Sequence, residues 1–231
     1  MALIQDSKVL FEQDTQIKAI FSNGQMVWPT IFRIPYSIVY TTTDNAKINP
    51  YSTSGLTIKS HTFIDNVGTI ILDPSTTEIP YHFFYNMSTL ATVEYGKGIT
   101  FSVSGYIHES CPNLNNVILP SDLTYIPQRM FRICPLLTSL DVPATVTGFG
   151  YYFLWQSGMV EGYYTPTVKI NNLVPVDFSN TSNWERIFIT NNPATYFDGM
   201  KNTPKVNVPA NVYNDYYNDT YWGQLPYLTA V

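Results

Sequence analysis

From about residue 58, hydrophobic positions follow a spacing that fits neither a helix nor a simple strand. Counted from Ile126, apolar residues recur five, eight, eleven, fourteen and sixteen positions further on, and a proline follows. These residues are Phe131, Cys134, Leu137, Leu140, Val142 and then Pro143. A helix needs intervals of three and four, and a strand needs alternation. The pattern therefore outlines a unit longer than one element.

The same spacing starts again elsewhere in the chain. Copies begin at Ile79, Val103 and Phe149, so that the four starts, Ile126 included, lie 24, 23 and 23 residues apart. Weaker copies begin at Leu173 and Asn192. A fixed period of this length is typical of stacked repeats. We predict a mainly β fold, a solenoid of about six rungs of roughly 19–24 residues over 58–210.

Each rung has a physical reason to stack on the next. Leu140 and Val142 lie two positions apart and share one face of a short strand, which Pro143 ends. One rung cannot bury its own apolar row, whereas rungs about 4.8 Å apart place like residues on like and form a continuous core. Cys111 and Cys134 fall in one slot, so we predict a buried thiol ladder rather than a redox pair or ligand set.

The two ends of the chain carry different patterns. Asn23-Gly24 between alternating segments predicts a hairpin, and we expect an N-terminal hairpin module over residues 1–30 followed by a β connector over 31–57. At the other end, Val212, Tyr216 and Tyr217 share a helical face. We therefore expect residues 211–231 to cap the last rung with a short helix.

The repeat from Ile126 to Val146 resembles the leucine-rich repeats of BspA-like proteins, whose units read "I…AF..C..L..I.IP.SV..I". The C-terminal "VNVPANVYNDYYNDTYWGQL" is similar to the ending of that family. "IKAIFSNGQMVWP" and "YSIVYTTTDNAKINPY" look like modules that precede such repeats in proteins of gut Bacteroidales and their crAss-like phages. The resemblance implies a leucine-rich-repeat solenoid that presents a surface for binding.

Composition and charge narrow the function classes. Charged residues make up 13% of the chain and aromatic residues 15%, with 18 Tyr, which is typical of a β-rich surface exposed outside the cell. The net charge is −5 and no Lys/Arg cluster occurs, so we expect no nucleic-acid partner. The N-terminus does not read as a signal peptide, and no apolar run predicts membrane insertion.

Candidate catalytic chemistry is sparse. His108 takes the slot that Phe84 and Phe131 hold in neighbouring copies, which favours a core residue over a catalytic base. His61 and His82 lie in separate units. No spacing matches a metal site, and no nucleophile, base and orienting group occur together. We expect no catalytic residues, no metal, no cofactor and no enzymatic activity.

Two sets of residues are candidates for binding. The N-terminal hairpin offers an apolar docking set, and an excess of aromatic residues in the fourth copy and just after it offers a platform for a protein or a glycan. The alternative for the aromatic set is that about half of it fills the rungs. The docking set is Ile17, Ile20, Phe21, Val27 and Trp28, and the platform is Tyr151, Tyr152, Trp155, Tyr163 and Tyr164.

An adhesin-like repeat without a recognisable export signal gives the leading hypothesis. It is a non-enzymatic phage virion protein, a head fibre, capsid decoration or tail-associated protein, made in the host cytoplasm and located on the virion. The N-terminus would dock on capsid or tail proteins, and the chain would form a homo-oligomer such as a trimer. Host-surface or mucus glycans are further candidate partners. The alternative is a bacterial BspA-like surface adhesin or mucin-binding repeat protein.

Overall fold

The computed structural model describes residues 7–11, 17–22, 25–26, 34–160, 163–164, 166–179, 187, 204–225 and 227–231. These form two units, Met1–Ile34 and Pro35–Val231. The first unit holds three antiparallel strands, β1 (Ser7–Phe11), β2 (Ile17–Ser22) and β3 (Gln25–Met26). Ser22 pairs with Gln25, as the predicted hairpin requires, and the turn residues Asn23 and Gly24 lie outside the described residues.

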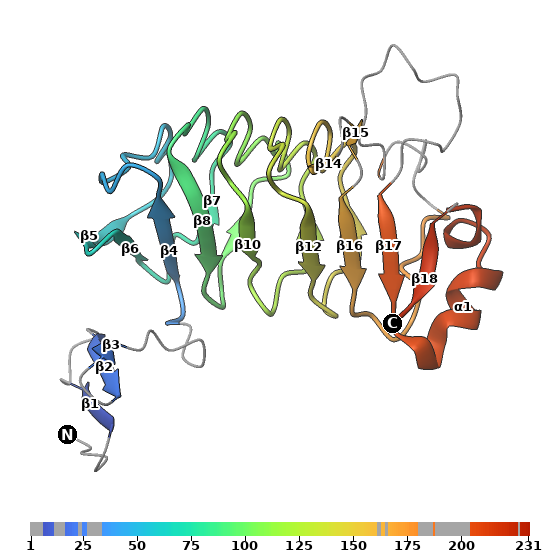
Figure 1. Ribbon diagram of the computed structural model, residues 1–231, viewed down its shortest axis with the longest axis horizontal. Helices are drawn as coiled ribbons and strands as arrows, with labels where there is room; N and C mark the ends of the chain where they lie inside the picture. The colour runs from blue at the N-terminus through green and yellow to red at the C-terminus, as the bar shows by residue number, and fades with distance from the viewer. Residues whose placement is uncertain are drawn as a thin grey trace. The chain divides into compact units, whose positions relative to one another are not determined.

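The second unit is a β-solenoid of about five turns, which confirms the predicted fold class. One strand of each rung lies beside the strand of the next, in chain order (Figure 1). Parallel pairing joins β10 to β8, and β12 to β16 and then β17. These strands are β8 (Leu90–Tyr95), β10 (Asn116–Ile118), β12 (Ser139–Val142), β16 (Thr167–Ile170) and β17 (Lys205–Val208).

A second row of two-residue strands follows the prolines and glycines that end the first. β7 pairs with β9, and β11 with β13, again in parallel. Their bounds are β7 (Glu78–Ile79), β9 (Thr100–Phe101), β11 (Tyr125–Ile126) and β13 (Gly148–Phe149). An antiparallel pair, β14 (Met159–Val160) and β15 (Tyr163–Tyr164), follows the fourth copy.

The first rung is covered by antiparallel strands. β4 (Ser37–Thr42) lies between β8 and β6 (Val67–Leu72), and β5 (Ile58–Ile64) forms the far edge of this sheet. β4 comes from the segment expected as a connector, and its Ile38 and Tyr40 side chains are fully buried. These strands therefore continue the solenoid core.

The last rung is covered by the C-terminal segment. It contains η3 (Ala210–Val212), α1 (Tyr213–Asn218), η4 (Trp222–Gln224) and β18 (Leu228–Ala230), and β18 pairs in parallel with β17. Tyr216 is buried as predicted, but Tyr217 is 59% exposed, because consecutive residues of a helix point about 100° apart and only one faces the core. In the described chain no helix is long and apolar enough to span a membrane.

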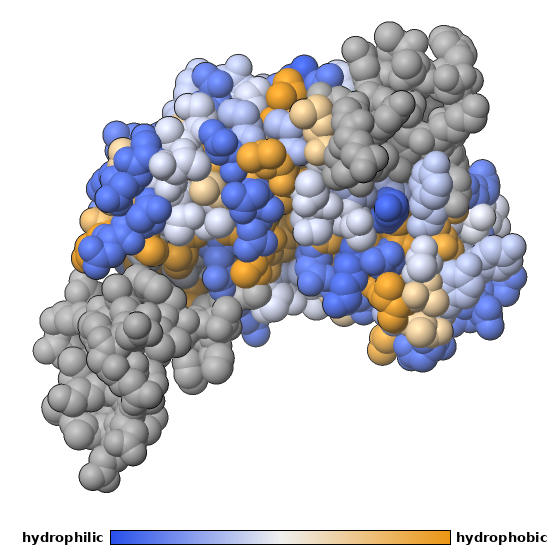
Figure 2. Space-filling view, viewed as in Figure 1, coloured by the Kyte–Doolittle hydropathy of each residue, from blue (hydrophilic) through white to orange (hydrophobic). Residues whose placement is uncertain are grey.

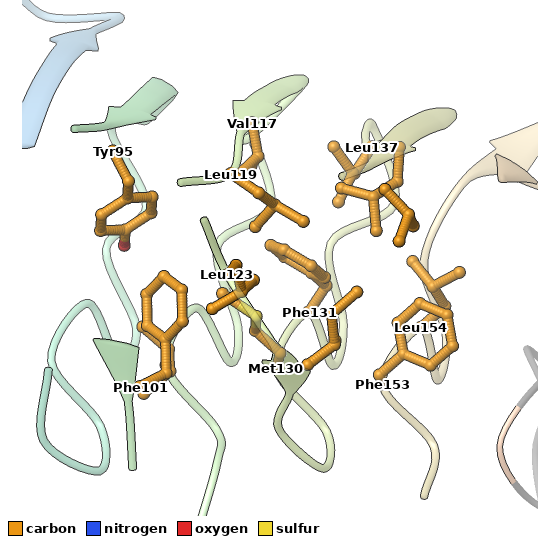
Figure 3. Close-up of a cluster of buried hydrophobic side chains, with 14 of the residues drawn as sticks. Tyr95, Phe101, Val117, Leu119, Leu123, Met130, Phe131, Leu137, Phe153 and Leu154 are labelled. Atoms are coloured by element: carbon orange, nitrogen blue, oxygen red, sulfur yellow. The ribbon is translucent and has the colours of Figure 1, made fainter. Parts of the chain in front are cut away.

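Inside the solenoid, equivalent side chains of successive rungs meet in one interior (Figure 3). Cys111 and Cys134 are fully buried and unbridged, as predicted. Each thiol donates to a main-chain carbonyl of the preceding rung, Cys111 Sγ to Phe84 O at 2.9 Å and Cys134 Sγ to His108 O at 3.1 Å. Ser157, in the same slot of the next rung, donates to Phe131 O. The slot selects a small side chain that satisfies a buried carbonyl.

Two predicted core positions are wrong. Leu173, taken as the start of the first weaker copy, is 61% exposed. Val103, taken as the start of the second copy, is 69% exposed. Phe101 takes that core slot and pairs with Ile79 on β7. The second copy therefore holds two extra residues, which form a turn that ends at Gly105 with a φ of 74°. A Cβ at Gly105 would stand 1.7 Å from Gln128 O, so the turn requires glycine.

We predict that Gly105→Ala lowers the free energy of unfolding by at least about 2 kcal/mol, because the methyl group collides with the next rung and φ is positive. Gly55 is the matched control: its φ is 79°, and nothing lies within 4 Å of an added Cβ. Gly55→Ala should cost only about 1 kcal/mol, from the backbone conformation alone. Urea denaturation measures both, and equal losses would contradict the steric argument.

We also predict that Ser157→Ala destabilises the protein by about 1–3 kcal/mol, because it leaves the buried Phe131 carbonyl without its donor. Ser157→Cys should lose less than half as much, since Cys111 and Cys134 hold the same slot. Chemical denaturation of the two variants is the measurement. A cysteine variant as unstable as the alanine variant would show that the hydrogen bond is not what the slot requires.

Candidate functional site

The turn between the two strand rows has the same backbone conformation in each of four rungs. Two non-glycine residues per rung adopt a positive φ between 49° and 62°. They are His82 and Asn86, Tyr106 and Ser110, Arg129 and Ile133, and Tyr152 and Gln156. Such residues cost roughly 1–2 kcal/mol each. Part of this cost is offset by amides of these turns that bond to the next rung, as from Tyr106 N to Gln128 O at 3.1 Å and from Arg129 N to Tyr151 O at 3.0 Å.

Repetition of this turn stacks polar and aromatic side chains in two columns on the surface. We call the resulting surface the ladder face. The four described rungs and one flanking tyrosine contribute Tyr51, Tyr81, His82, Tyr85, Tyr106, Glu109, Arg129, Arg132, Tyr152 and Trp155. All of these side chains except Glu109 retain exposed surface.

Rings dominate the N-terminal half of the ladder face. The His82 ring lies 3.6 Å from the Tyr81 ring and 4.4 Å from that of Tyr85. Tyr51 meets Tyr85 edge-on at 5.3 Å, and Tyr81 meets Tyr106 in the same way at 5.4 Å. The N-terminal half of the ladder face is therefore a continuous aromatic surface, in which each ring packs against the next.

Guanidinium groups dominate the C-terminal half. Arg129 lies over the rings of Tyr106, Tyr152 and Trp155, at 5.2, 5.4 and 5.8 Å from their centroids, and it donates to the Tyr106 hydroxyl. Arg132 lies 4.7 Å from the Trp155 centroid. These stacked cation–π contacts fix both side chains before any ligand arrives.

Glu109 joins the two halves. The residue is only 6% exposed, and its carboxylate accepts a hydrogen bond from Arg132 and lies 3.2 Å from His82 Nε2. A carboxylate this buried needs such partners. With His82 counted as neutral, the two arginines exceed Glu109 by one positive charge. The surface therefore favours acceptor-rich and acidic groups.

The predicted platform residues are divided by the structure. Tyr152 and Trp155 lie together, 5.8 Å between centroids, within the ladder face. Tyr151 instead lines a pocket on the β11–β13 side of the rung. Tyr163 and Tyr164 form β15, and their side chains are outside the description.

The predicted docking residues are located only in part. Ile17, Ile20 and Phe21 lie on β2, where side chains are not described. Val27 and Trp28 fall outside the described residues. Docking therefore stays a prediction.

The sequence pattern alone missed the centre of the ladder face, which Arg129, Arg132 and Glu109 form. Their spacing was the signal in the sequence that could have found them. Tyr106 and Arg129 are 23 positions apart, as are Glu109 and Arg132, and 23 residues is the length of one repeat.

Buried titratable groups lie away from the ladder face. Burial lowers the pKa of His108 to about 3, and its ring stacks between Phe84 and Phe131 as predicted from its slot. Burial likewise raises the pKa of Cys111 to about 12, which keeps this thiol protonated and unreactive. In the described ranges, no three His, Cys, Asp or Glu side chains group as metal ligands.

The repeated turn, the stacked strands and the thiol slot together agree with one known repeat family. The family described as "BspA type leucine rich repeat region (6 copies)" matches residues 36–161 and 101–217. The chain belongs to the BspA-type leucine-rich repeat family. This family and its fold are typical of binding scaffolds rather than catalysts.

One solved structure is similar to part of this BspA-type protein. It is a leucine rich cell surface protein from Faecalibacterium prausnitzii, with 21% identity and a TM-score of 0.37. The similarity covers 56% of this chain and 42% of that chain, so it spans less than half of that protein. A search of the curated proteins gave no match.

We predict that His108 makes this BspA-type protein acid-sensitive. Its ordinary pKa of 6.5 falls to about 3 on folding, so the unfolded chain takes up the proton first. Stability is therefore intact above pH 6.5 and falls as the pH drops toward 3. Between pH 7.5 and 5 this group should remove about 2 kcal/mol of unfolding free energy.

The control replaces the histidine together with its hydrogen-bond partner, since Tyr95 OH lies 2.8 Å from His108 Nε2. His108→Phe with Tyr95→Phe restores the apolar ladder and leaves neither polar group alone. Urea titrations at both pH values should show a shallower pH dependence in the double variant. An unchanged slope would assign the acid sensitivity to other groups.

Proposed function

We propose that this BspA-type protein is an adhesive repeat protein of a bacterial surface that binds an acidic protein partner through the ladder face. The observation that carries the proposal is the stacked cluster of Arg129 and Arg132 over Tyr106, Tyr152 and Trp155. Trp, Tyr and Arg are the residue types that dominate the binding energy of protein interfaces. Here they gather at the centre of one rigid surface.

Rigidity supports binding as much as composition does. Both arginines already lie in fixed contacts, so a partner has little side-chain entropy to remove. The excess positive charge speeds encounter with acidic partners and selects against basic ones. Hydrophobic residues lie among hydrophilic ones on the coloured part of the surface in Figure 2.

A location on a phage particle, with capsid or tail partners, stays a prediction from the sequence. Neither the family match nor the fold supports a virion role over a surface role. A repeat family typical of binding scaffolds fits the adhesin alternative better. The homo-oligomer likewise stays a prediction from the sequence.

Binding to purified mucin and to immobilised extracellular-matrix proteins tests the proposal. We predict that Arg129→Ala with Trp155→Ala weakens binding at least tenfold, because both the charge and its aromatic support are lost. Lys169→Ala is the matched control, since it removes an exposed cation on β16 outside the ladder face. Interferometry measures the affinities. If the control lost as much affinity as the double variant, the effect would be one of general charge attraction and not of the ladder face.

Location needs a separate experiment. Antibody labelling of intact cells should detect the protein at the bacterial surface, and mass spectrometry of purified phage particles should not. Detection in particles, without labelling of cells, would overturn the surface proposal in favour of the virion hypothesis.

A further inference from the structure

A pocket of about 330 Å³ lies beside the second strand row and shares no lining residue with the ladder face. Its lining includes Tyr125 and Tyr151, Gln128 and Thr147, and Asp177 with the buried Phe178. This volume is at the lower end of the range for small-molecule sites, which is about 300–1,000 Å³. The pocket therefore has room for one small ring rather than for a helix or a strand.

The two rungs that line the pocket differ in side-chain size. Tyr125 on β11 pairs with Gly148 on β13, so the rung that follows offers no side chain beside the tyrosine ring. A Cβ at Gly148 would lie 2.8 Å from that ring, and a Cβ at Gly150 would lie 2.1 Å from Gln128 N. Glycine at both positions therefore permits the close approach of the Tyr125 ring and of the Gln128 backbone beside the pocket.

The charged group among the described residues of the pocket is the carboxylate of Asp177, which two hydrogen bonds hold in place. Asp177 Oδ1 accepts Ser179 N at 2.8 Å, and Oδ2 accepts the Ser179 hydroxyl at 2.9 Å. These two bonds lower the pKa of Asp177, so the group is ionised at neutral pH. Each carboxylate oxygen keeps a further lone pair for a donor. Two neighbouring hydroxyl groups of a ligand match this arrangement.

Charge decides between ligand classes. Among the described residues that line the pocket, Asp177 is the one charged group, and it is negative. Asp177 would repel a phosphate, a sugar that carries a carboxylate or an acidic side chain, and no described lining residue supplies a cation to compensate. A neutral ligand that is rich in hydroxyl donors and has an apolar face to cover the tyrosine rings fits instead.

We propose that this pocket binds a single ring of a neutral carbohydrate. The rings of Tyr125 and Tyr151 cover the C–H face of the sugar, and Asp177 accepts hydrogen bonds from two of its hydroxyl groups. Gln128 and Thr147 contact the remaining polar edge. The site is separate from the ladder face, so it stands whether or not that surface binds a protein.

Nuclear magnetic resonance tests the proposal on the full chain. The probes are methyl glycosides of glucose, galactose and mannose, with N-acetylglucosamine, each titrated at millimolar concentrations. The readout is the amide signals of Gly148 and Gly150, which report from the pocket itself. N-acetylneuraminic acid is the anionic comparison, and N-acetyltyrosine amide stands for a peptide side chain.

We expect at least one neutral sugar to shift both glycine signals and the two comparison compounds to leave them in place. Asp177→Asn should raise the dissociation constant at least tenfold. Asp141→Asn, the matched control on an exposed carboxylate of β12, should not change it. The Arg129→Ala variant should bind the sugar as the wild type does, which separates this site from the proposed function.

Three results would overturn the proposal. The first is that no neutral sugar shifts the two glycine signals. The second is that the anionic sugar or the tyrosine amide shifts them more strongly than any neutral sugar. The third is that Asp177→Asn, shown by its melting curve to be folded, binds as tightly as the wild type.

Discussion

Main-chain hydrogen bonds between successive rungs hold each position of one repeat directly beside the same position of the next. The amides of Phe84, His108 and Phe131 each bond to a carbonyl one rung further on, at 2.8, 2.9 and 2.9 Å. Because the bonds recur at equivalent positions, side chains of one slot form a column through the molecule. Every residue of a slot is then part of the environment of two others, and stability is shared between neighbouring rungs.

This constraint explains how the chain tolerates departures from its own pattern. Where a phenylalanine column receives His108, the Tyr95 hydroxyl meets the ring nitrogen at 2.8 Å. Where the ladder face receives Glu109 in its interior, Arg132 and His82 reach it from the neighbouring rungs. A polar residue in a buried column is stable only with such a partner, since an unpaired group would keep its full desolvation cost. Opposite Tyr125 the column holds Gly148, which leaves room for the tyrosine ring beside the pocket.

The same constraint separates what the sequence predicted from what it did not. Apolar slots repeat in type, so their spacing predicted the solenoid, the thiol ladder and the place of His108. The ladder face repeats in position but not in type: one column holds histidine, tyrosine, arginine and tyrosine. Its conformation, a positive φ at residues other than glycine, is also not encoded by residue type. Val103 was predicted wrongly because it is apolar, lies two places from the true core position and fits the repeat spacing. The turn around Gly105 places it outside the core.

Binding surfaces of this kind depend on the scaffold giving up some stability. In the first three of the four turns that contain positive-φ residues, main-chain amides bond to the adjoining rung and help to hold this conformation. That conformation directs two side chains per rung outward at close spacing, which a regular strand, with its alternation, does not do. Arg129 can therefore contact three rings at once: Tyr106 in the preceding rung, and Tyr152 and Trp155 in the following rung. The strain of the turns and the order of the ladder face are two results of one backbone arrangement, so a variant that relaxes the turn should also loosen the surface that it supports.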